Sequence, residues 1–432
     1  MDPNAEAPQL RSERAARGHV GTRRRIAILG IALALAGAAT ACSATATPSS
    51  SAAPSTYTVW DPYPQFDHGS AWARLLAQCG TASGVTVKRT AFDTTDLTSK
   101  VLLAAQQGSA PDVLIVDNPV VTTLAQAGIL TDTDTIKSDT SDVEANLLAA
   151  GQLNGKTYGI PIGANTLALY YNTNVLRAAG VDPASVRDWA SLTAALAKVK
   201  AAGKKGIAFS AIGTEEGSFQ FLPWFWGAGA KLTDLSSPQA VAALALWNGW
   251  LKNGYAPNSV INDTQTTSWQ EFTTGQFAFA ENGTWQLAGA RQAGFPYGII
   301  PIPARNGGTA PAPTGGEFVT VPTQSDTSRY ATDQQLVACL TKADNAYATD
   351  TTLTYVGATD AVQHQQVTTS PDLATWVSAV HAAKGRTSDN LGTKYPKISE
   401  QLWTAVQAAL SGSASPDGAL AAAQKAAAAA TG

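Results

Sequence analysis

The sequence is poor in the residues that build metal and redox centres. Three cysteines, four histidines and one methionine occur in 432 residues. No two histidines have the spacing of a metal site, and two of the cysteines, Cys79 and Cys339, lie too far apart in the sequence to indicate a zinc site. The sequence therefore predicts no bound metal and no cofactor.

Charged residues are also scarce. They make up 14 % of the chain, against ~25 % in a typical soluble protein. Beyond residue 41 the chain keeps 23 Lys and Arg against 29 Asp and Glu, a net charge of −6. Nucleic-acid binding depends on basic patches, so this balance argues against a nucleic-acid partner. About 375 residues follow residue 57, which is enough for two domains.

Recognisable catalytic motifs are missing as well. No Gly-x-Ser-x-Gly turn, phosphate-binding loop or Gly-x-Gly-x-x-Gly segment follows a predicted strand. Carboxylates are numerous, but nothing in their spacing singles out a pair for glycoside hydrolysis. The sequence thus favours a protein that is not an enzyme, with an exported carbohydrate-active enzyme as the alternative.

The N-terminus has the pattern of an export signal. Three arginines at positions 23–25 precede a hydrophobic run over 26–41, which is shorter than the ~20 residues of a membrane span. Cys42 follows, in a setting that resembles a bacterial lipobox with Ala39 in place of the usual leucine. We expect a signal peptide over 1–41, lipidation of Cys42, and a Ser/Thr/Pro-rich flexible tether over 42–56. An ordinary signal peptide with an unmodified cysteine is the alternative.

Two α/β units follow the tether. In the first, strands at 57–60, 85–87 and 112–116 alternate with helices at 70–80, 93–107 and 119–128. This alternation indicates a parallel sheet with right-handed crossovers. The second unit occupies about 172–305, with helices at 188–202 and 237–254 and strands at 206–209, 277–279 and 297–303. A further strand is expected at 315–321, and helices dominate after residue 333.

Tryptophan is the positive compositional signal, with eleven in the chain. Flat aromatic rings stack on the C–H faces of sugars, while neighbouring polar side chains bond the hydroxyls. Trp60 and Trp285 fall in predicted loops, where stacking on a ligand is favoured over core packing. For Trp224 and Trp226 the two roles remain open. Helical spacing places Trp247, Trp250 and Trp403 in the core instead.

The order of several motifs resembles that of family 1 extracellular solute-binding proteins, the maltodextrin-binding-protein-like receptors of ABC sugar importers. The resemblance covers nearly all of 57–430. It is carried by the segments APDVLIV at 110–116, NGKTYGIP at 154–161, FTTGQFAFAENGTW at 272–285, GGEF at 315–318 and YPKIS at 395–399.

This resemblance implies an α/β fold of two lobes, joined by a multi-strand hinge, with the ligand in the cleft between them. We expect lobe 1 to comprise 57–165 and 314–360, and lobe 2 to comprise 166–313. The C-terminal helices over 361–432 are expected mainly on lobe 2. Cys79 and Cys339 then share one lobe. The sequence by itself only slightly favours a disulfide over two buried free thiols, and the resemblance strengthens the disulfide.

The resemblance also implies ligand-binding residues at matching positions. Trp285 matches a stacking tryptophan, and Asn165 occupies a hinge position where maltodextrin binders carry a glutamate. This departure argues for a different pattern of sugar hydroxyls. The full expected set is Trp60, Asp61, Asp117, Asn118, Asn165, Trp224, Trp226, Trp285, Glu317 and Arg386. For Asp117 and Asn118, capping of the helix that starts near Pro119 is a compatible alternative.

Together these features predict a monomeric sugar receptor, anchored through Cys42 to the outer face of the cytoplasmic membrane. Its expected partners are a carbohydrate ligand and the membrane permease of an ABC transporter. Three alternatives stay open: a non-sugar polar solute on the same fold, a receptor that presents its ligand only to a sensor, and the exported enzyme.

Overall fold

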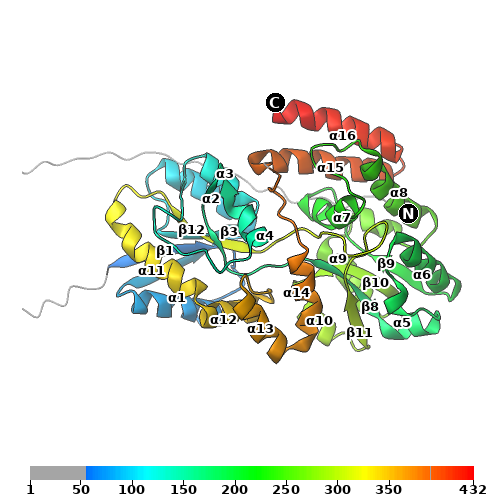
Figure 1. Ribbon diagram of the computed structural model, residues 1–432, viewed down its shortest axis with the longest axis horizontal. Coiled ribbons are helices and arrows are strands. Elements are labelled where there is room, and N and C mark those ends of the chain that lie inside the picture. Colours follow the sequence, from blue (N-terminus) through cyan, green and yellow to red (C-terminus); the bar gives the residue numbers. More distant parts are fainter. Residues whose placement is uncertain (1–54, 390) are drawn as a thin grey trace, which may run out of the picture. The chain divides into compact units, whose positions relative to one another are not determined.

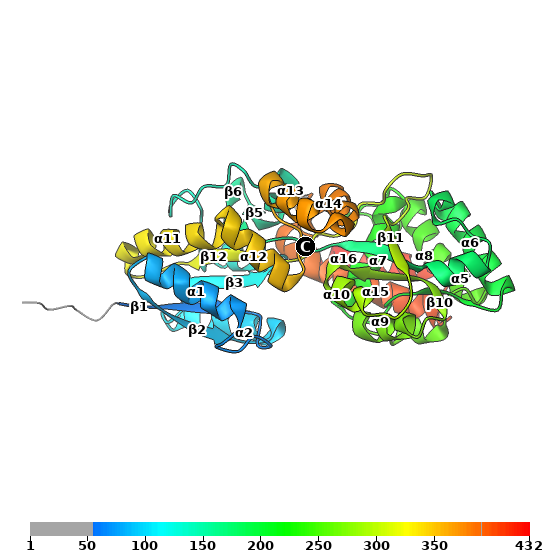
Figure 2. The same cartoon turned by 90° about the horizontal axis from the view of Figure 1, so that it is seen from below.

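Two β-sheets organise the chain in the computed structural model, which describes residues 55–389 and 391–432. The predicted signal peptide, the lipidation residue Cys42 and nearly all of the tether lie outside the described residues. Each sheet carries helices on both faces, and we call each sheet with its helices a lobe (Figures 1 and 2). The two-lobed α/β class expected from the sequence is confirmed.

The sheet of lobe 1 has the strand order β2-β1-β3-β12-β4, and β7 also pairs with β12. Strand β1 runs parallel to β2 and β3, as the alternating pattern predicts, whereas β12 is antiparallel to β3. The strands are β1 (Thr56–Asp61), β2 (Thr86–Ala91), β3 (Val113–Asp117), β4 (Leu130–Thr131), β7 (Ile160–Pro161) and β12 (Glu317–Pro322).

Successive side chains over residues 113–116 of β3 point to opposite faces of the sheet, and both sets are hydrophobic. Val113 and Ile115 pack with α1 and α11 on one face, while Leu114 and Val116 pack with α2 and α3 on the other. Successive side chains of a strand point to opposite faces, so a continuously hydrophobic strand needs helices on both. The helices of lobe 1 are α1 (Ala71–Ala82), α2 (Thr94–Gln106), α3 (Val120–Gln126), α11 (Tyr330–Thr341) and α12 (Ala343–Leu353).

A disulfide fastens two helices of lobe 1. Cys79 on α1 is bonded to Cys339 on α11, with their Cα atoms 5.6 Å apart. The bond joins helices separated by 260 residues of sequence, because α11 belongs to the segment that returns to lobe 1. The structure thus contains the pairing that the family resemblance favoured.

The sheet of lobe 2 has the order β11-β8-β10-β9, with β10 antiparallel to β8 and parallel to β9. Its strands are β8 (Leu167–Asn172), β9 (Lys205–Ala208), β10 (Phe277–Gly283) and β11 (Tyr297–Ile300). Its larger core lies under α5 (Thr173–Ala178), α6 (Trp189–Ala201), α7 (Glu215–Gly227), α8 (Pro238–Lys252), α15 (Tyr395–Leu410) and α16 (Pro416–Thr431). The opposite face is covered by α9 (Gln265–Thr273), α10 (Leu287–Arg291) and α14 (Ala374–His381).

Capping residues determine where two of these helices begin. The Ser237 side chain accepts a hydrogen bond from the Ala240 backbone N–H, and Pro238 occupies the first turn of α8. Asp188 and Ser191 form a reciprocal capping box at the start of α6. Both helix starts agree with the sequence prediction to within a residue.

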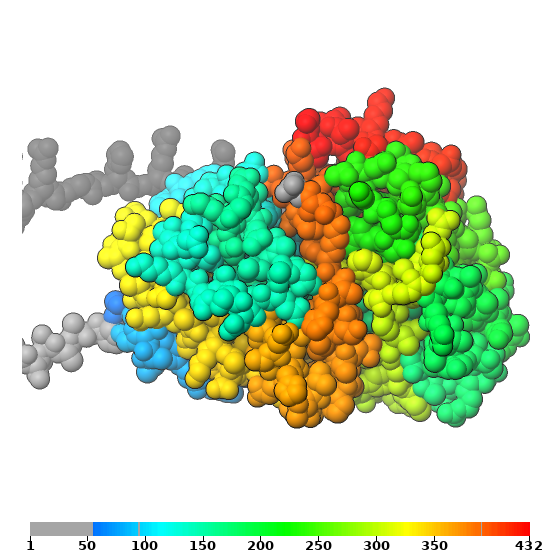
Figure 3. Space-filling view, in the orientation of Figure 1, coloured from blue at the N-terminus to red at the C-terminus, as the bar shows by residue number. Residues whose placement is uncertain are grey.

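Several chain segments cross between the lobes side by side. Isolated bridges pair Ala164 with Val356, Asn165 with Gly315, and Pro313 with Lys384. Helix α13 (Asp360–Thr369) and α14 follow one of these crossings, and Figure 3 shows this orange part of the chain between the lobes on the face in view. Among the described residues, none of the helices is both long and hydrophobic enough to cross a lipid bilayer.

Candidate functional site

A cavity of about 280 Å³ lies between the lobes. We call it the interlobe cavity. Lobe 1 contributes the end of β3 and the start of β12, and lobe 2 contributes the starts of α7 and α9 and the turn after β10. Its lining residues are Asp117, Asn165, Glu215, Glu216, Phe219, Gln265, Trp285, Gly315, Gly316, Glu317 and Arg386. Carboxyl ends of parallel strands such as β3 are the usual place for ligands in α/β sheets.

Arg386 links the two lobes across this cavity. It is only 3 % exposed. Its Nη1 donates to Glu215 Oε1 at 2.9 Å, and its Nη2 donates to Asp117 Oδ1 at 3.4 Å. Burial acts to lower the pKa of Arg386, but Asp117, Tyr395 and Glu215 outweigh it and raise the pKa above its ordinary value. The guanidinium therefore stays charged, and its Nε is a buried donor without a partner among the described residues.

The two carboxylates around Arg386 are themselves held in place. Tyr395 donates its hydroxyl to Glu215 Oε1 and Ser399 donates to Glu215 Oε2, both at 2.5 Å. Burial raises the pKa of Asp117, although Arg386 and the backbone N–H of Asn118 oppose the rise. A network fixed in this way presents preformed acceptors and donors to a polar ligand.

Glu317, the first residue of β12, is the second acidic centre. Its Oε2 accepts hydrogen bonds from Tyr63 Oη at 2.8 Å and Tyr355 Oη at 2.5 Å. Burial, followed by the nearby charge of Asp117, raises the pKa of Glu317 to about 7, against the lowering effect of the two tyrosines and Arg386. Near neutral pH this carboxyl group can both accept and donate a hydrogen bond.

Two aromatic rings supply the apolar side of the cavity. The ring centroids of Trp285 and Phe219 are 6.3 Å apart. The guanidinium carbon of Arg386 lies 4.9 Å from the centroid of the Phe219 ring. A Cβ at Gly283 would lie 2.0 Å from the Trp285 ring. Glycine at 283 is therefore what allows the indole of Trp285 to lie over the end of β10.

Asn165 reaches the cavity for a similar reason. A Cβ at Gly315 would lie 2.1 Å from Asn165 Oδ1. Gly316 has φ of +97°, a conformation that residues with a Cβ rarely adopt. The Gly315-Gly316 pair thus brings the crossing strand close to Asn165 before Glu317 enters the sheet.

Of the ten expected ligand-binding residues, five line the interlobe cavity: Asp117, Asn165, Trp285, Glu317 and Arg386. The structure brings together residues that lie up to 269 positions apart in the sequence, as the Arg386–Asp117 contact shows.

The other five lie elsewhere. Asp61 is fully buried and accepts hydrogen bonds from Arg89 and from Trp72 Nε1, so its carboxylate stabilises lobe 1. Trp60, next to it, packs edge-on against Phe92. Asn118 is 2 % exposed and donates to Thr314.

Trp224 and Trp226 prove to be core residues of lobe 2. Trp224 is fully buried and donates from Nε1 to Glu281 Oε2 at 2.7 Å, and Trp226 is 6 % exposed. Neither ring lines the cavity, so the structure does not support the stacking role considered for them. Both rings lie on helix α7.

Four further lining residues, contributed by α7 and α9, were not predicted from the sequence: Glu215, Glu216, Phe219 and Gln265. One signal was available. Two glutamates directly after Thr214 are typical of a helix N-terminus, where negative side chains are favoured. Pro223, eight residues later, interrupts the pattern of a helix and obscured it.

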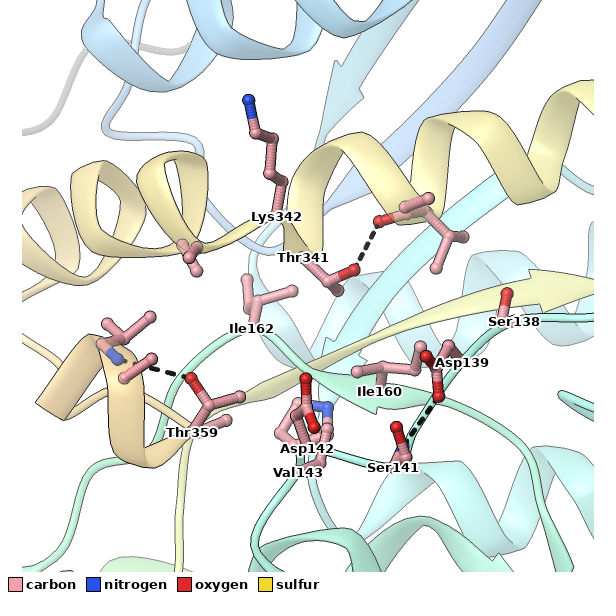
Figure 4. Close-up of a pocket in the computed structure, with 18 of the residues that line it drawn as sticks. Ser138, Asp139, Ser141, Asp142, Val143, Ile160, Ile162, Thr341, Lys342 and Thr359 are labelled. Carbon is pink, nitrogen blue, oxygen red and sulfur yellow. Dashed lines mark hydrogen bonds between the residues drawn. The ribbon is translucent and has the colours of Figure 1, made fainter.

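A larger cavity of about 910 Å³ lies among the loop 137–144, β7 and helices α11, α12 and α13. In Figure 4, Thr341 and Lys342 lie on one side of it and Ser141 and Asp142 on the other. The described residues that line it include no aromatic ring. It therefore offers no flat apolar surface for a sugar, unlike the interlobe cavity.

One group of side chains in the described ranges could share a metal ion. Ligand atoms of Glu144, Asp360 and His381 lie within 4.8 Å of one another. His381 Nε2 is 3.0 Å from Glu144 Oε1 and 2.8 Å from Gln363 Oε1, and Gln363 also donates to Glu144. These contacts account for the proximity of His381 and Glu144 without an ion.

A two-lobed α/β fold with a polar and aromatic cavity between its lobes defines a ligand-binding protein. The chain belongs to the bacterial extracellular solute-binding protein family, whose model matches residues 74–375.

Individual relatives agree with this assignment. The maltodextrin-binding protein MdxE of Bacillus subtilis is 30 % identical over 221 residues, which cover 48 % of this chain and 51 % of that protein. A maltooligosaccharide ABC transporter solute-binding lipoprotein of Streptococcus pneumoniae is 28 % identical over 251 residues, 54 % of this chain and 56 % of the relative. The matched regions thus span about half the length of these two relatives.

A solved structure matches more completely. The cyclic alpha-maltosyl-1,6-maltose binding protein of Arthrobacter globiformis has a TM-score of 0.73 and 25 % identity, covering 87 % of this chain and 98 % of that one. The likeness therefore extends through both lobes.

Proposed function

We propose that this protein binds a sugar in the interlobe cavity and delivers it to the membrane permease of an ABC transporter. One observation supports the sugar most strongly: Trp285 and Phe219 face the same cavity as Asp117, Glu317 and Arg386. An aromatic surface beside hydrogen-bonding groups matches the two surfaces of a sugar ring. The names of the Bacillus, Streptococcus and Arthrobacter relatives point to the same class of ligand.

Binding is proposed to act by closure of the lobes around the sugar. A ligand shifts such an equilibrium only by its greater affinity for the closed form. Contacts to both lobes provide that difference. Asp117 and Glu317 belong to lobe 1, and Glu215, Phe219 and Trp285 belong to lobe 2.

A thermal-shift screen of the purified full-length protein against mono- and oligosaccharides tests the proposal. A bound sugar at a hundredfold excess over its Kd stabilises the folded protein by about 2.7 kcal/mol. We expect at least one carbohydrate to raise the melting temperature. If none does, the sugar proposal fails and a non-sugar polar solute becomes the ligand to seek.

The same samples test our proposal that the protein has no catalytic activity. Chromatography of the sugars after prolonged incubation is expected to show them unchanged. Turnover of any sugar would instead establish the exported enzyme.

We further propose that the mature chain begins at a lipidated Cys42, with a tether to residue 56 that holds a monomeric receptor at the outer face of the cytoplasmic membrane. The Streptococcus relative is named as a lipoprotein, which supports this arrangement. A Cys42→Ser variant is expected to appear in the culture medium instead of the membrane fraction. A variant that remains with the membrane would contradict the anchor.

We also propose that the first segments of the two lobes end at residues 165 and 313, and that the chain returns to lobe 1 over 314–360. These limits fall within or beside the crossing segments at Ala164–Val356, Asn165–Gly315 and Pro313–Lys384. Helices α15 and α16, which pack on the core of lobe 2, support placing most of 361–432 with that lobe.

A further inference from the structure

The interlobe cavity contains more negative than positive groups. Four carboxylates line it, those of Asp117, Glu215, Glu216 and Glu317. Arg386 is the one cationic side chain among the described residues that line it. With every group ionised, the cavity therefore carries three uncompensated negative charges.

Arg386 neutralises only part of this set. Its two terminal nitrogens are directed at Glu215 and Asp117. Among the ion pairs of the described residues, none includes Glu216 or Glu317. Within the described residues, both are held by neutral donors: Glu216 accepts a hydrogen bond from the Gln265 backbone N–H, and Glu317 accepts two from tyrosine hydroxyls.

Glu317 is placed to receive a cation. The hydroxyls of Tyr63 and Tyr355 both donate to Oε2, so Oε1 remains available. Burying a carboxylate without a positive partner is costly, and a cation brought by the ligand would remove that cost. The ring of Trp285 favours the same charge, because cations are attracted to aromatic faces.

From this geometry we propose that the ligand is a basic sugar, whose protonated nitrogen contacts the carboxylate of Glu317. The inference rests on the proposed sugar-binding function and narrows its ligand class. Neutral hydroxyls can bond to Asp117 and Glu215, but they give the ionised form of Glu317 no positive partner.

Matched pairs of sugars test the inference by isothermal titration calorimetry on the full-length protein. Glucose and glucosamine, galactose and galactosamine, and cellobiose and its diamino counterpart chitobiose differ only in oxygen against nitrogen at C2. We expect the amino member of at least one pair to bind ten times more tightly than the neutral member, a difference of about 1.4 kcal/mol.

A Glu317→Gln variant should reduce the amino sugar's advantage over its neutral partner from tenfold to less than threefold, because glutamine can still accept the tyrosine hydroxyls but carries no charge. Glu400→Gln removes the same charge at an exposed position of α15 that does not line the cavity, and it should keep the preference.

The outcomes separate the two proposals. If neutral sugars bind as well as or better than their amino partners, the basic-sugar inference is overturned while sugar binding stands. A preference that survives Glu317→Gln overturns the assigned contact. If no sugar of any pair binds, the proposed function and the inference fail together.

Discussion

Arg386 shows, at the scale of single residues, how the interlobe site is assembled. It lies in a segment that crosses between the lobes, and it contacts Asp117 of one lobe and Glu215 of the other. A buried arginine needs such partners, because an unpaired buried charge is strongly destabilising. The site's charge therefore depends on three segments that are distant in the sequence.

Trp285 carries the first prediction. Replacing it with alanine removes the aromatic face of the cavity, and we expect sugar affinity to fall at least tenfold, about 1.4 kcal/mol. The melting temperature of the free protein should change little, since the indole is only half-buried. Calorimetric titration measures the affinity, with Trp403→Ala on α15 as the matched control. Unchanged affinity in the Trp285 variant would refute the stacking role.

Asp333 carries a prediction about pH and stability. It is fully buried on α11, and neither carboxylate oxygen has a hydrogen-bond partner among the described residues. Burial, together with the charge of Asp112, raises its pKa to about 8, although Arg329 opposes the rise. In unfolded chains the pKa is about 3.9. The folded state therefore binds the proton more tightly, and this group's contribution to stability falls as pH rises from about 4 to 8.

Asp333→Asn should remove that pH dependence. We compare the free energy of unfolding of the variant with that of the wild-type protein at each pH. The difference, variant minus wild type, should be larger at pH 8 than at pH 5 by at least about 1 kcal/mol. Urea titrations at the two pH values measure this difference. A difference that stays constant, or that shrinks toward pH 8, would show that Asp333 is not a protonated buried acid.

At the scale of secondary-structure elements, regular patterns were the predictable part of the fold. Helix α8 and strand β3 appear where the sequence predicts them. Each is a continuous segment whose hydrophobic pattern and flanking residues are those of one kind of element. Helix α7 was missed because it is buried on nearly every side and contains Pro223. A helix that is hydrophobic all round shows no amphipathic period.

The candidate site was predictable to the same limited degree. Trp285 and Glu317 could be found because each follows a recognisable glycine-containing motif. Asp61 could not be excluded from sequence, since its partner Arg89 lies on the neighbouring strand β2 and is brought close only by sheet pairing. The role of Trp224 stayed open at the level of sequence for the related reason that its burial depends on packing across lobe 2.

The turn after β10 offers an element-scale prediction. A side chain at Gly283 would collide with the Trp285 ring. Gly283→Ala should therefore displace the indole and weaken sugar binding about tenfold. Gly249→Ala is the matched control. Apart from its chain neighbours and the nearby backbone of α8, no described atom lies within 4 Å of the added Cβ, and the change should stabilise α8 by about 0.5–1 kcal/mol. If Gly283→Ala binds sugar normally, the glycine does not position Trp285.

At the scale of the whole molecule, the segments that cross between the lobes also contribute residues to the interlobe cavity. Asn165, Gly315 and Arg386 lie in or beside these segments and also line the cavity. A ligand that contacts them touches the part of the chain about which the lobes would move. In the proposed mechanism, ligand capture and lobe closure are therefore coupled through the same residues.

Hydrogen exchange with and without a bound sugar tests the central claim most directly. The account predicts slower exchange in both lobes at once, at the end of β3, at the start of α7 and in residues 281–287. Protection confined to one lobe, or centred on the loop 137–144 and the α11–α12 junction beside the larger cavity, would contradict a sugar site between the lobes.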